Sequence, residues 1–435
     1  MVLRRALTLF AAAVALRAGT VPDLPERVRQ ARAGAGLLRI LHLGDSHVAA
    51  ASGHRSYDAF FRARFGDGGP GSGLPWAAPR PGLRASASPG WRFHRKDDGD
   101  RMLGLGGSFM ETARAGTWAR VEGRGSRMRL QLLRQPGGGR AAVRLDGALL
   151  ATLDLDGETG LVPLERELPA SAGPHTLEVH CLDGGRVRLL GVAFEGAAGA
   201  VYSPMGVVGA QASWMLEVPE SLFTAEVAAE APDLVILAFG TNEANDPAFD
   251  PPSYQHGLEQ LLGRFHRAAP QALLVLLGPP DARLPRAQPG ALERVAALQQ
   301  AVAARAGALL LDQRRAMGGP GAIAAWLQEG LAARDQVHFA PAGYQRLAVA
   351  VLGSLMPALG QSGDIRIPDA PRSAFRELPR AREAAPPSPP ASGQRVDGGE
   401  GHAIYVFRQA DGRLFITDNP ASVAGKAGTW VGKAP

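Results

Sequence analysis

Cysteine is almost absent from the chain: among 435 residues, only Cys181 occurs. A disulfide within the chain is therefore impossible, and a cysteine-rich metal site is excluded. Cys181 alternates with Leu177 and Val179 in the pattern of one strand face, so we interpret its thiol as buried and inert rather than as a nucleophile.

Aromatic residues are also scarce, at 6% of the chain, and beyond the N-terminal region no run is long and apolar enough to span a bilayer. The net charge is +6, but the arginines are scattered and form no basic stripe with interleaved aromatics. This pattern argues against a nucleic-acid partner. Attraction to an anionic polymer fits the same charge.

The N-terminus has the pattern of a secretory signal peptide. Residues 1–5 end in two arginines and form a basic segment, and residues 6–16 form an apolar run. Arg17 disturbs the small-residue cleavage site, so a short N-terminal anchor or an ordinary helix stays open as the alternative. We expect export to the periplasm or the exterior of a bacterial cell, with no stable membrane span after signal cleavage.

The main body alternates strands with helices. Residues 37–43 have the pattern of a buried strand, and residues 234–239 and 273–277 are continuous apolar runs, typical of buried parallel strands. Residues 254–268 and 291–306 have helical character. This alternation predicts an α/β fold with a parallel sheet covered on both faces.

A different pattern interrupts the α/β segments over residues 116–194. Short alternating runs are separated there by turn residues such as Asp146-Gly147. Several short strands at this spacing predict a β-sandwich of about 90 residues, inserted into the α/β domain.

The predicted organisation has a linker and a small module after the main body. The linker is rich in Pro, Ala, Ser and Arg and cannot build a core. Two apolar runs around Ala410-Asp411-Gly412 indicate a β-hairpin, which needs a partner because a lone hairpin is marginally stable. In chain order we expect a signal peptide (residues 1–19), the first part of the α/β domain (20–100), the inserted carbohydrate-binding-like β-sandwich (101–198), the second part of the α/β domain (199–360), the linker (361–399) and the C-terminal β module (400–435).

Polar residues follow two of the predicted strands. Ser46, in Gly44-Asp45-Ser46-His47, ends the first strand, and open α/β sheets bind ligands at such carboxyl ends. Its hydroxyl can point into the crevice, although a serine there can also merely cap the next helix. Asn242 follows another strand and can donate its amide into the same crevice, or form an Asx turn.

Asp335 and His338 lie in the loop before Pro341, which suits the first turn of a helix. At this spacing the carboxylate can curl back and accept from one imidazole nitrogen, leaving the other free as a general base. Metal ligation is the alternative, but no matching carboxylate or histidine pair is found. We therefore expect no metal and no cofactor.

Taken in order, these segments make the chain resemble the SGNH (GDSL-type) hydrolases, with Gly209 matching the glycine block of that family. The resemblance implies a three-layer α/β/α sandwich that performs acyl transfer. Ser46 would be the nucleophile, His338 the base that takes its proton, and Asp335 the group that orients the imidazole. The oxyanion hole would consist of the backbone N–H groups of Ser46 and Gly209 and the Asn242 amide.

The resemblance covers roughly residues 37–79 and 200–357. Two departures from the family pattern occur. His47 replaces the usual Leu after the serine, and Glu243 follows the asparagine where Asp is commoner. Neither departure removes a group that the implied mechanism needs.

A narrower resemblance concerns the substrate. His47, the Gly-rich residues 66–71 and the β-rich insertion resemble periplasmic peptidoglycan O-acetylesterases. This implies a monomeric esterase that acts on O-acetylated glycan, with peptidoglycan favoured. A polysaccharide O-acetyltransferase, a general acetyl or lipid esterase, and a wall-glycan-binding protein with an inactive site stay open as alternatives.

Overall fold

The computed structural model describes residues 23–77, 80–169, 174–363, 365–368, 404–409, 414–417 and 428–434. The predicted signal peptide and most of the predicted linker lie outside these residues. The chain forms two compact units, Met1–Pro371 and Arg372–Pro435. Within the described ranges, no helix has the length and apolar character needed to cross a membrane.

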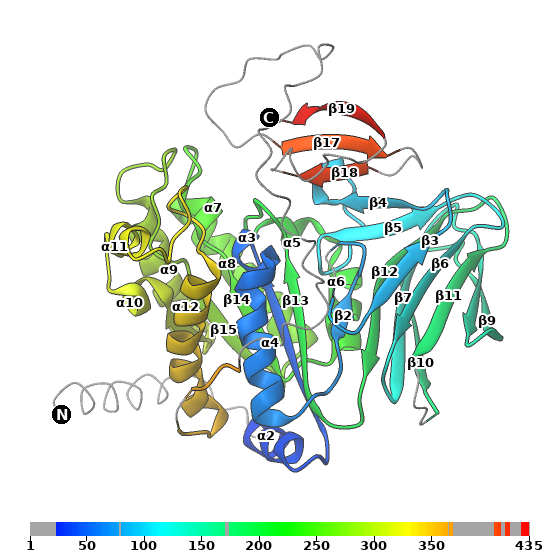
Figure 1. Cartoon of the computed structure of the whole chain (residues 1–435), viewed down its shortest axis with the longest axis horizontal. Coiled ribbons are helices and arrows are strands. Elements are labelled where there is room, and N and C mark those ends of the chain that lie inside the picture. The colour runs from blue at the N-terminus through cyan, green and yellow to red at the C-terminus, as the bar shows by residue number, and fades with distance from the viewer. Residues whose placement is uncertain are drawn as a thin grey trace, which may run out of the picture. The chain divides into compact units, whose positions relative to one another are not determined.

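A five-stranded parallel sheet forms the centre of the first unit, in the order β13-β1-β14-β15-β16 (Figure 1). This arrangement confirms the predicted α/β fold with a parallel sheet. The strands are β1 (Leu37–Gly44), β13 (Gly199–Gly206), β14 (Leu234–Ala238), β15 (Leu273–Gly278) and β16 (Leu309–Asp312).

Helices cover both faces of the sheet, which explains why its strands are almost continuously apolar. In β1, Leu38 and Ile40 belong to the core on one face, and Leu41 and Leu43 belong to the core on the other. The first face is covered by α2 (Leu24–Arg32), α4 (Ala51–Phe65), α10 (Gln313–Met317), α11 (Ala322–Gln328) and α12 (Pro341–Leu355), and the second by α5 (Trp214–Glu217), α6 (Glu220–Glu230), α8 (Pro251–Ala268) and α9 (Ala291–Ala306).

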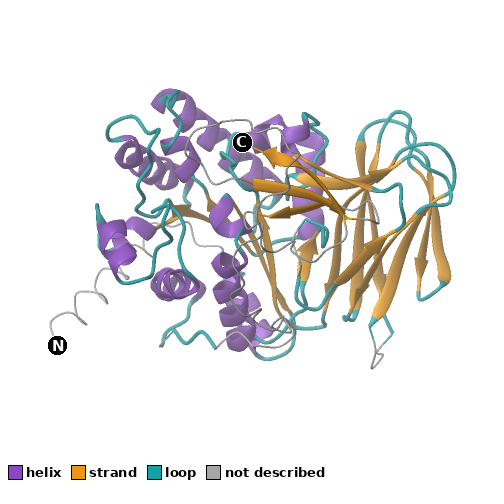
Figure 2. Cartoon of the chain, turned by 45° about the horizontal axis from the view of Figure 1, so that its top comes forward, coloured by secondary structure: helices purple, strands orange, loops and turns teal. Residues whose placement is uncertain are grey.

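Two antiparallel sheets interrupt the α/β part, in agreement with the predicted β insertion. Figure 2 shows these strands to one side of the helices. Their facing sides share one apolar core, in which Leu130 of one sheet and Val179 and Cys181 of the other are buried. One sheet contains β10 (Gly160–Glu167), β7 (Arg127–Arg134), β12 (Val187–Glu195), β5 (Ser108–Thr112), β4 (Arg92–Arg95) and β2 (Gly71–Gly73); the other contains β3 (Arg84–Ala87), β6 (Trp118–Gly123), β11 (His175–Cys181), β8 (Arg140–Leu145) and β9 (Ala148–Asp154).

Three of these strands, β2, β3 and β4, precede residue 101, where the insertion was expected to begin. Each is only three or four residues long. Strands this short and polar have almost no alternation that a sequence pattern can reveal. They are recruited by pairing with distant strands: β3 pairs with β6, β4 with β5 and β2 with β12.

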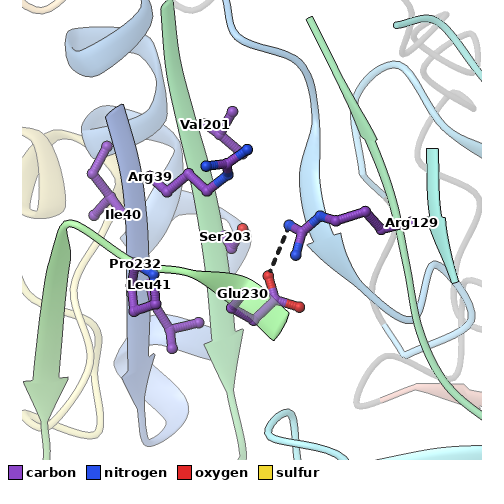
Figure 3. A pocket seen from close by; sticks show the side chains of 8 residues that line it. All are labelled: Arg39, Ile40, Leu41, Arg129, Val201, Ser203, Glu230 and Pro232. Carbon is purple, nitrogen blue, oxygen red and sulfur yellow. Dashed lines mark hydrogen bonds and ion pairs between the residues drawn. The ribbon is translucent and has the colours of Figure 1, made fainter. Parts of the chain in front are cut away.

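A buried ionic network joins the parallel sheet to the β-sandwich. Glu195 is fully buried and lies 2.9 Å from Arg39 of β1 and 2.7 Å from Arg129 of β7, measured between guanidinium nitrogen and carboxylate oxygen. Arg129 also lies 3.1 Å from Glu230, and Figure 3 shows this pair beside Arg39 in the wall of a small cavity. Because each carboxylate faces a guanidinium, neither buried charge is left unpaired.

The second unit contains a three-stranded antiparallel sheet in the order β18-β17-β19. The predicted hairpin is present in β17 (Ile404–Gln409) and β18 (Leu414–Thr417), with Tyr405 opposite Thr417. On its other edge β17 pairs with β19 (Gly428–Ala434). This third strand is a partner of the kind that a two-stranded hairpin needs for stability.

Candidate active site

Ser46 is the first residue of the short helix α3 (Ser46–Ala49), directly beyond the carboxyl end of β1. Gly44 permits the tight passage from strand to helix, since a Cβ there would lie 2.7 Å from the Ala238 carbonyl oxygen. Asp45 caps the helix, because its Oδ1 accepts from the His47 backbone N–H at 2.9 Å. The serine therefore lies at the sheet edge where α/β proteins bind ligands.

The structure joins Ser46, His338 and Asp335 into one hydrogen-bonded chain. Ser46 Oγ lies 2.8 Å from His338 Nε2, and His338 Nδ1 lies 2.7 Å from Asp335 Oδ2. The carboxylate can only accept, so Nδ1 carries the proton and Nε2 faces the serine as an acceptor. This is the orientation in which an imidazole can take a proton from a serine hydroxyl.

The loop that carries Asp335 is curled in the way its spacing predicted. Asp335 Oδ1 accepts from the backbone N–H groups of Val337 and His338, at 2.9 and 3.0 Å. Gln336 adopts a left-handed backbone conformation, with φ of 57°, which tightens this turn. Desolvation raises the pKa of Asp335, but hydrogen bonds from the His338 side chain and these two amides outweigh it and hold the pKa below its ordinary value.

The segment that carries Gly209 runs beside the nucleophile turn. The backbone N–H of Val207, directly after β13, donates to the Gly44 carbonyl at 2.9 Å. Gly209 itself has φ of +71°, a conformation that suits glycine. Asn242 lies in α7 (Thr241–Ala244), and its Nδ2 donates to the Ala210 carbonyl at 2.9 Å. The structure thus brings the glycine segment and the asparagine segment into direct contact.

His47 lies beside His338, with ring centroids 5.2 Å apart. Its Nδ1 is 3.1 Å from the Tyr344 hydroxyl, and its ring also contacts Phe339. Burial lowers the pKa of His47 to about 3, so this imidazole is neutral. The residue that departs from the family pattern therefore contributes an uncharged wall to the histidine side of the site.

The sequence reasoning missed the role of Glu243. Its Oε1 accepts from the Ala212 N–H at 2.7 Å, and its Oε2 accepts from the Gly240 N–H at 2.9 Å. The contact with Gly240 is the backward capping bond that a residue at the third helical position makes. A Gly-x-x-Glu pattern in the sequence could therefore have indicated this contact. The contact with Ala212 spans distant parts of the chain and leaves no local signal.

Two buried carboxyl groups flank the site and predict how stability depends on pH. Burial raises the pKa of Asp45 to about 6 and that of Glu243 to about 7. The folded state therefore holds these protons more tightly than the unfolded state does. We expect the contribution of each group to the unfolding free energy to fall, by an amount on the order of 3 kcal/mol, as pH rises from about 4 to above 7.

Thermal unfolding at a series of pH values checks this expectation. The melting temperature of Glu243→Gln should fall less steeply between pH 5 and 7.5 than that of the wild type, because one of the two titrating groups is removed. Parallel profiles for the two proteins would contradict the assignment.

Across the described ranges, no cluster of three or more His, Cys, Asp or Glu side chains is arranged to hold a metal ion.

Part of the chain that carries this geometry matches a known protein family. Residues 178–346 match the GDSL-like lipase/acylhydrolase family. The match contains Gly209, Asn242, Asp335 and His338, whereas Ser46 lies on the other side of the β insertion. No curated protein matches the sequence of the chain.

Among solved structures, the chain is similar to a peptidoglycan O-acetylesterase, with a TM-score of 0.67, 23% identity, and coverage of 79% of this chain and 97% of the other. A family two carbohydrate esterase from Clostridium thermocellum gives a TM-score of only 0.31 at 15% identity, over 62% of this chain and 99% of the other. The first likeness shows that the fold is shared over most of both chains.

The sheet topology and the similar solved structure together show the class of fold: the chain has the α/β fold of SGNH-type hydrolases. It carries a GDSL-like lipase/acylhydrolase domain and is a carboxylic ester hydrolase.

Proposed function

We propose that the protein is a serine esterase that removes O-acetyl groups from cell-wall glycan, with peptidoglycan as the favoured polymer. The observation that carries the proposal is the hydrogen-bonded chain from Ser46 through His338 to Asp335 at the carboxyl edge of the parallel sheet. This chain contains a nucleophile, a base and the group that orients the base, which is the set that acyl transfer to water requires.

The geometry supports a two-step reaction. Ser46 Oγ attacks the acetyl carbonyl carbon while His338 Nε2 accepts the hydroxyl proton. The bond between the carbonyl carbon and the sugar oxygen then breaks, and His338 returns the proton to that oxygen, leaving acetyl-Ser46. A water molecule, deprotonated by His338, then attacks the acetyl carbon; the bond to Ser46 Oγ breaks, His338 returns the proton to Oγ, and acetate leaves. Asp335 stabilises the imidazolium that forms in each step.

The negative charge of each tetrahedral intermediate requires donors on the far side of the carbonyl. The backbone N–H groups of Ser46 and Gly209 and the side chain of Asn242 are the proposed donors. An amide nitrogen carries two hydrogens, and the structure shows one Asn242 hydrogen bond, to the Ala210 carbonyl. The second hydrogen is therefore available for the oxyanion while the first fixes the direction of the side chain.

Replacing Asn242 with alanine should lower kcat by about 10²–10³-fold, the usual loss when one oxyanion donor is removed. Hydrolysis of p-nitrophenyl acetate measures it, with melting temperature as the check on folding. Asn245→Ala is the matched control: Asn245 follows the same turn, and its Oδ1 accepts from the Arg286 backbone N–H at 3.1 Å, away from the triad. Near-normal turnover in Asn242→Ala would remove that residue from the oxyanion hole.

Four features support acetylated glycan as the substrate. The similar fold belongs to a peptidoglycan O-acetylesterase. The β-sandwich inserted after the nucleophile segment, expected over residues 101–198, is proposed as a carbohydrate-binding-like module. The net charge of +6 suits an anionic polymer, and the N-terminal pattern suits a periplasmic or secreted enzyme.

Acetate release tests the substrate class. The wild type should release acetate from O-acetylated peptidoglycan faster than from O-acetylated xylan, and Ser46→Ala should release none. Faster release from xylan would point to a different glycan. Transfer of acetyl groups onto the glycan from an added donor ester would instead identify an O-acetyltransferase. If neither polymer is deacetylated, the cell-wall proposal fails.

A further inference from the structure

Gly209 is held in place from two sides rather than by its own packing. A Cβ at this position would meet nothing within 4 Å, so the residue lies in open space. On its N-terminal side, the Val207 N–H donates to the Gly44 carbonyl of the nucleophile strand at 2.9 Å, and the Ala210 N–H closes a turn onto the Val207 carbonyl at 3.1 Å. On its C-terminal side, the Ala212 N–H donates to Glu243 at 2.7 Å.

Glu243 fixes the asparagine segment with its other oxygen. Glu243 Oε2 accepts from the Gly240 N–H at 2.9 Å, at the start of the turn that carries Asn242. Another residue would not fit in place of Gly240, since its φ is +128° and a Cβ there would lie 2.9 Å from the Pro279 ring. One side chain, only 5% exposed, therefore ties the glycine loop to the asparagine turn.

We propose that Glu243 is a positioning residue for the oxyanion hole: its carboxylate sets the distance between the segment that carries Gly209 and the turn that carries Asn242. This inference rests on the proposed function, in which these two residues donate to the oxyanion. Glu243 itself touches no reacting atom in this account. Its contacts affect the reaction rate because oxyanion donors must be placed to within a fraction of an ångström to stabilise a developing charge.

The other contacts between the two segments do not replace this one. Gln211 Nε2 donates to Asp246 Oδ2 at 2.9 Å, but Asp246 is only partly buried, so water competes for the bond. The contact from Asn242 to the Ala210 carbonyl is made by the side chain whose position is to be explained, so it is not an independent link. Glu243 supplies the buried link, and a hydrogen bond to a carboxylate is stronger where water is excluded than where water can reach it.

The chemistry of the two donors explains why a carboxylate is required. Two backbone N–H groups, from Ala212 and Gly240, point at one side chain, so it must offer two acceptor oxygens. Glutamine has the same shape but turns an NH₂ group toward one of the two donors. Aspartate keeps both oxygens but is one methylene shorter, so we expect it to keep the local bond to Gly240 and lose the bond to Ala212.

Kinetics of Glu243→Gln test the proposal, measured with p-nitrophenyl acetate at pH 8, where the wild-type carboxyl is ionised. We expect kcat to fall about 10- to 100-fold while KM changes less than about threefold, since misplaced oxyanion donors weaken the transition state and not the ground state. Glu226→Gln is the control: it removes another buried glutamate, on α6, and should leave kcat unchanged. Wild-type kcat in folded Glu243→Gln would overturn the proposal.

A double-variant cycle with Asn242→Ala distinguishes positioning from general destabilisation. If Glu243 acts through the oxyanion donors, the two losses should be less than multiplicative, because the second substitution misplaces a donor that is already gone. Multiplicative losses would overturn the positioning role. They would leave the proposed function intact, since the loss in Asn242→Ala alone tests that function separately.

Glu243→Asp covers the case in which Glu243→Gln does not fold. It keeps the charge and one of the two backbone contacts, so it should fold and show a kcat between those of the wild type and Asn242→Ala, with KM nearly unchanged. A wild-type kcat in Glu243→Asp, together with an unfolded Glu243→Gln, would reduce Glu243 to a purely structural residue and refute the inference.

Discussion

Replacing Ser46 with alanine is expected to lower kcat for p-nitrophenyl acetate by about 10⁴–10⁶-fold, the loss typical of removing a serine nucleophile. Without Oγ there is no atom to form the acyl-enzyme, and His338 Nε2 loses its hydrogen-bond partner at 2.8 Å. The residual rate should reflect only binding and the oxyanion donors. The fold should survive, because α3 is capped by the Asp45 side chain and not by the serine.

Ser354→Ala is the matched control for this experiment. Ser354 is an exposed serine on α12, and its hydroxyl donates only to the Ala350 carbonyl of the same helix at 3.1 Å. This variant should hydrolyse the ester at the wild-type rate. If Ser46→Ala kept more than about one per cent of the wild-type kcat, the nucleophile would have to be another residue.

Replacing Asp335 with asparagine should lower kcat by about 10³–10⁴-fold with little change in KM. The Val337 and His338 backbone N–H groups point at one carboxylate oxygen, so the asparagine carbonyl should occupy that position. Its NH₂ group then faces His338 Nδ1, which must give up its proton. The imidazole is driven into the tautomer with hydrogen on Nε2, and that tautomer cannot accept a proton from Ser46.

Asp250→Asn provides the comparison for Asp335→Asn. Asp250 also accepts from the backbone N–H three residues later, that of Ser253, at 3.0 Å, but it contacts no histidine. Asparagine caps a helix about as well as aspartate, so this variant should keep both stability and activity. Equal loss in the two variants would show that Asp335 supports only the loop and not the tautomer of His338.

The sequence was informative where local pattern and tertiary structure coincide. Residues 234–239 and 273–277 are apolar throughout and residues 37–43 mostly so, because helices cover both sides of the sheet, and each segment corresponds to a parallel strand. The curl of Asp335 toward His338 was also predictable, because both residues lie within one tight turn. In these cases the controlling interactions lie within a few residues along the chain.

Features that depend on distant pairing could not be predicted. The short strands β3 and β4 exist because longer strands offer them an edge. The ion pair between Arg39 and Glu195 joins residues 156 positions apart, and neither residue shows locally that it is buried. The position of His47 against His338 likewise follows from how α3 meets the loop before α12.

The link from Glu243 to Ala212 belongs to the same group of distant contacts. A glutamate in place of the commoner aspartate looked like a neutral departure, because a sequence shows the residue type and not the distance that its side chain must span. With the extra methylene, the carboxylate reaches the Ala212 N–H in a second loop while it also contacts the Gly240 N–H.

The most direct test of the account is the site of covalent labelling by a fluorophosphonate. A serine esterase nucleophile attacks the phosphorus atom and displaces fluoride, which leaves a stable phosphonyl-serine. Peptide mass spectrometry of the inactivated wild type should find one label, on Ser46, appearing in proportion to the loss of ester hydrolysis and absent from Ser46→Ala. A label on another residue, or inactivation with Ser46 unmodified, would contradict the assignment of Ser46 as the nucleophile.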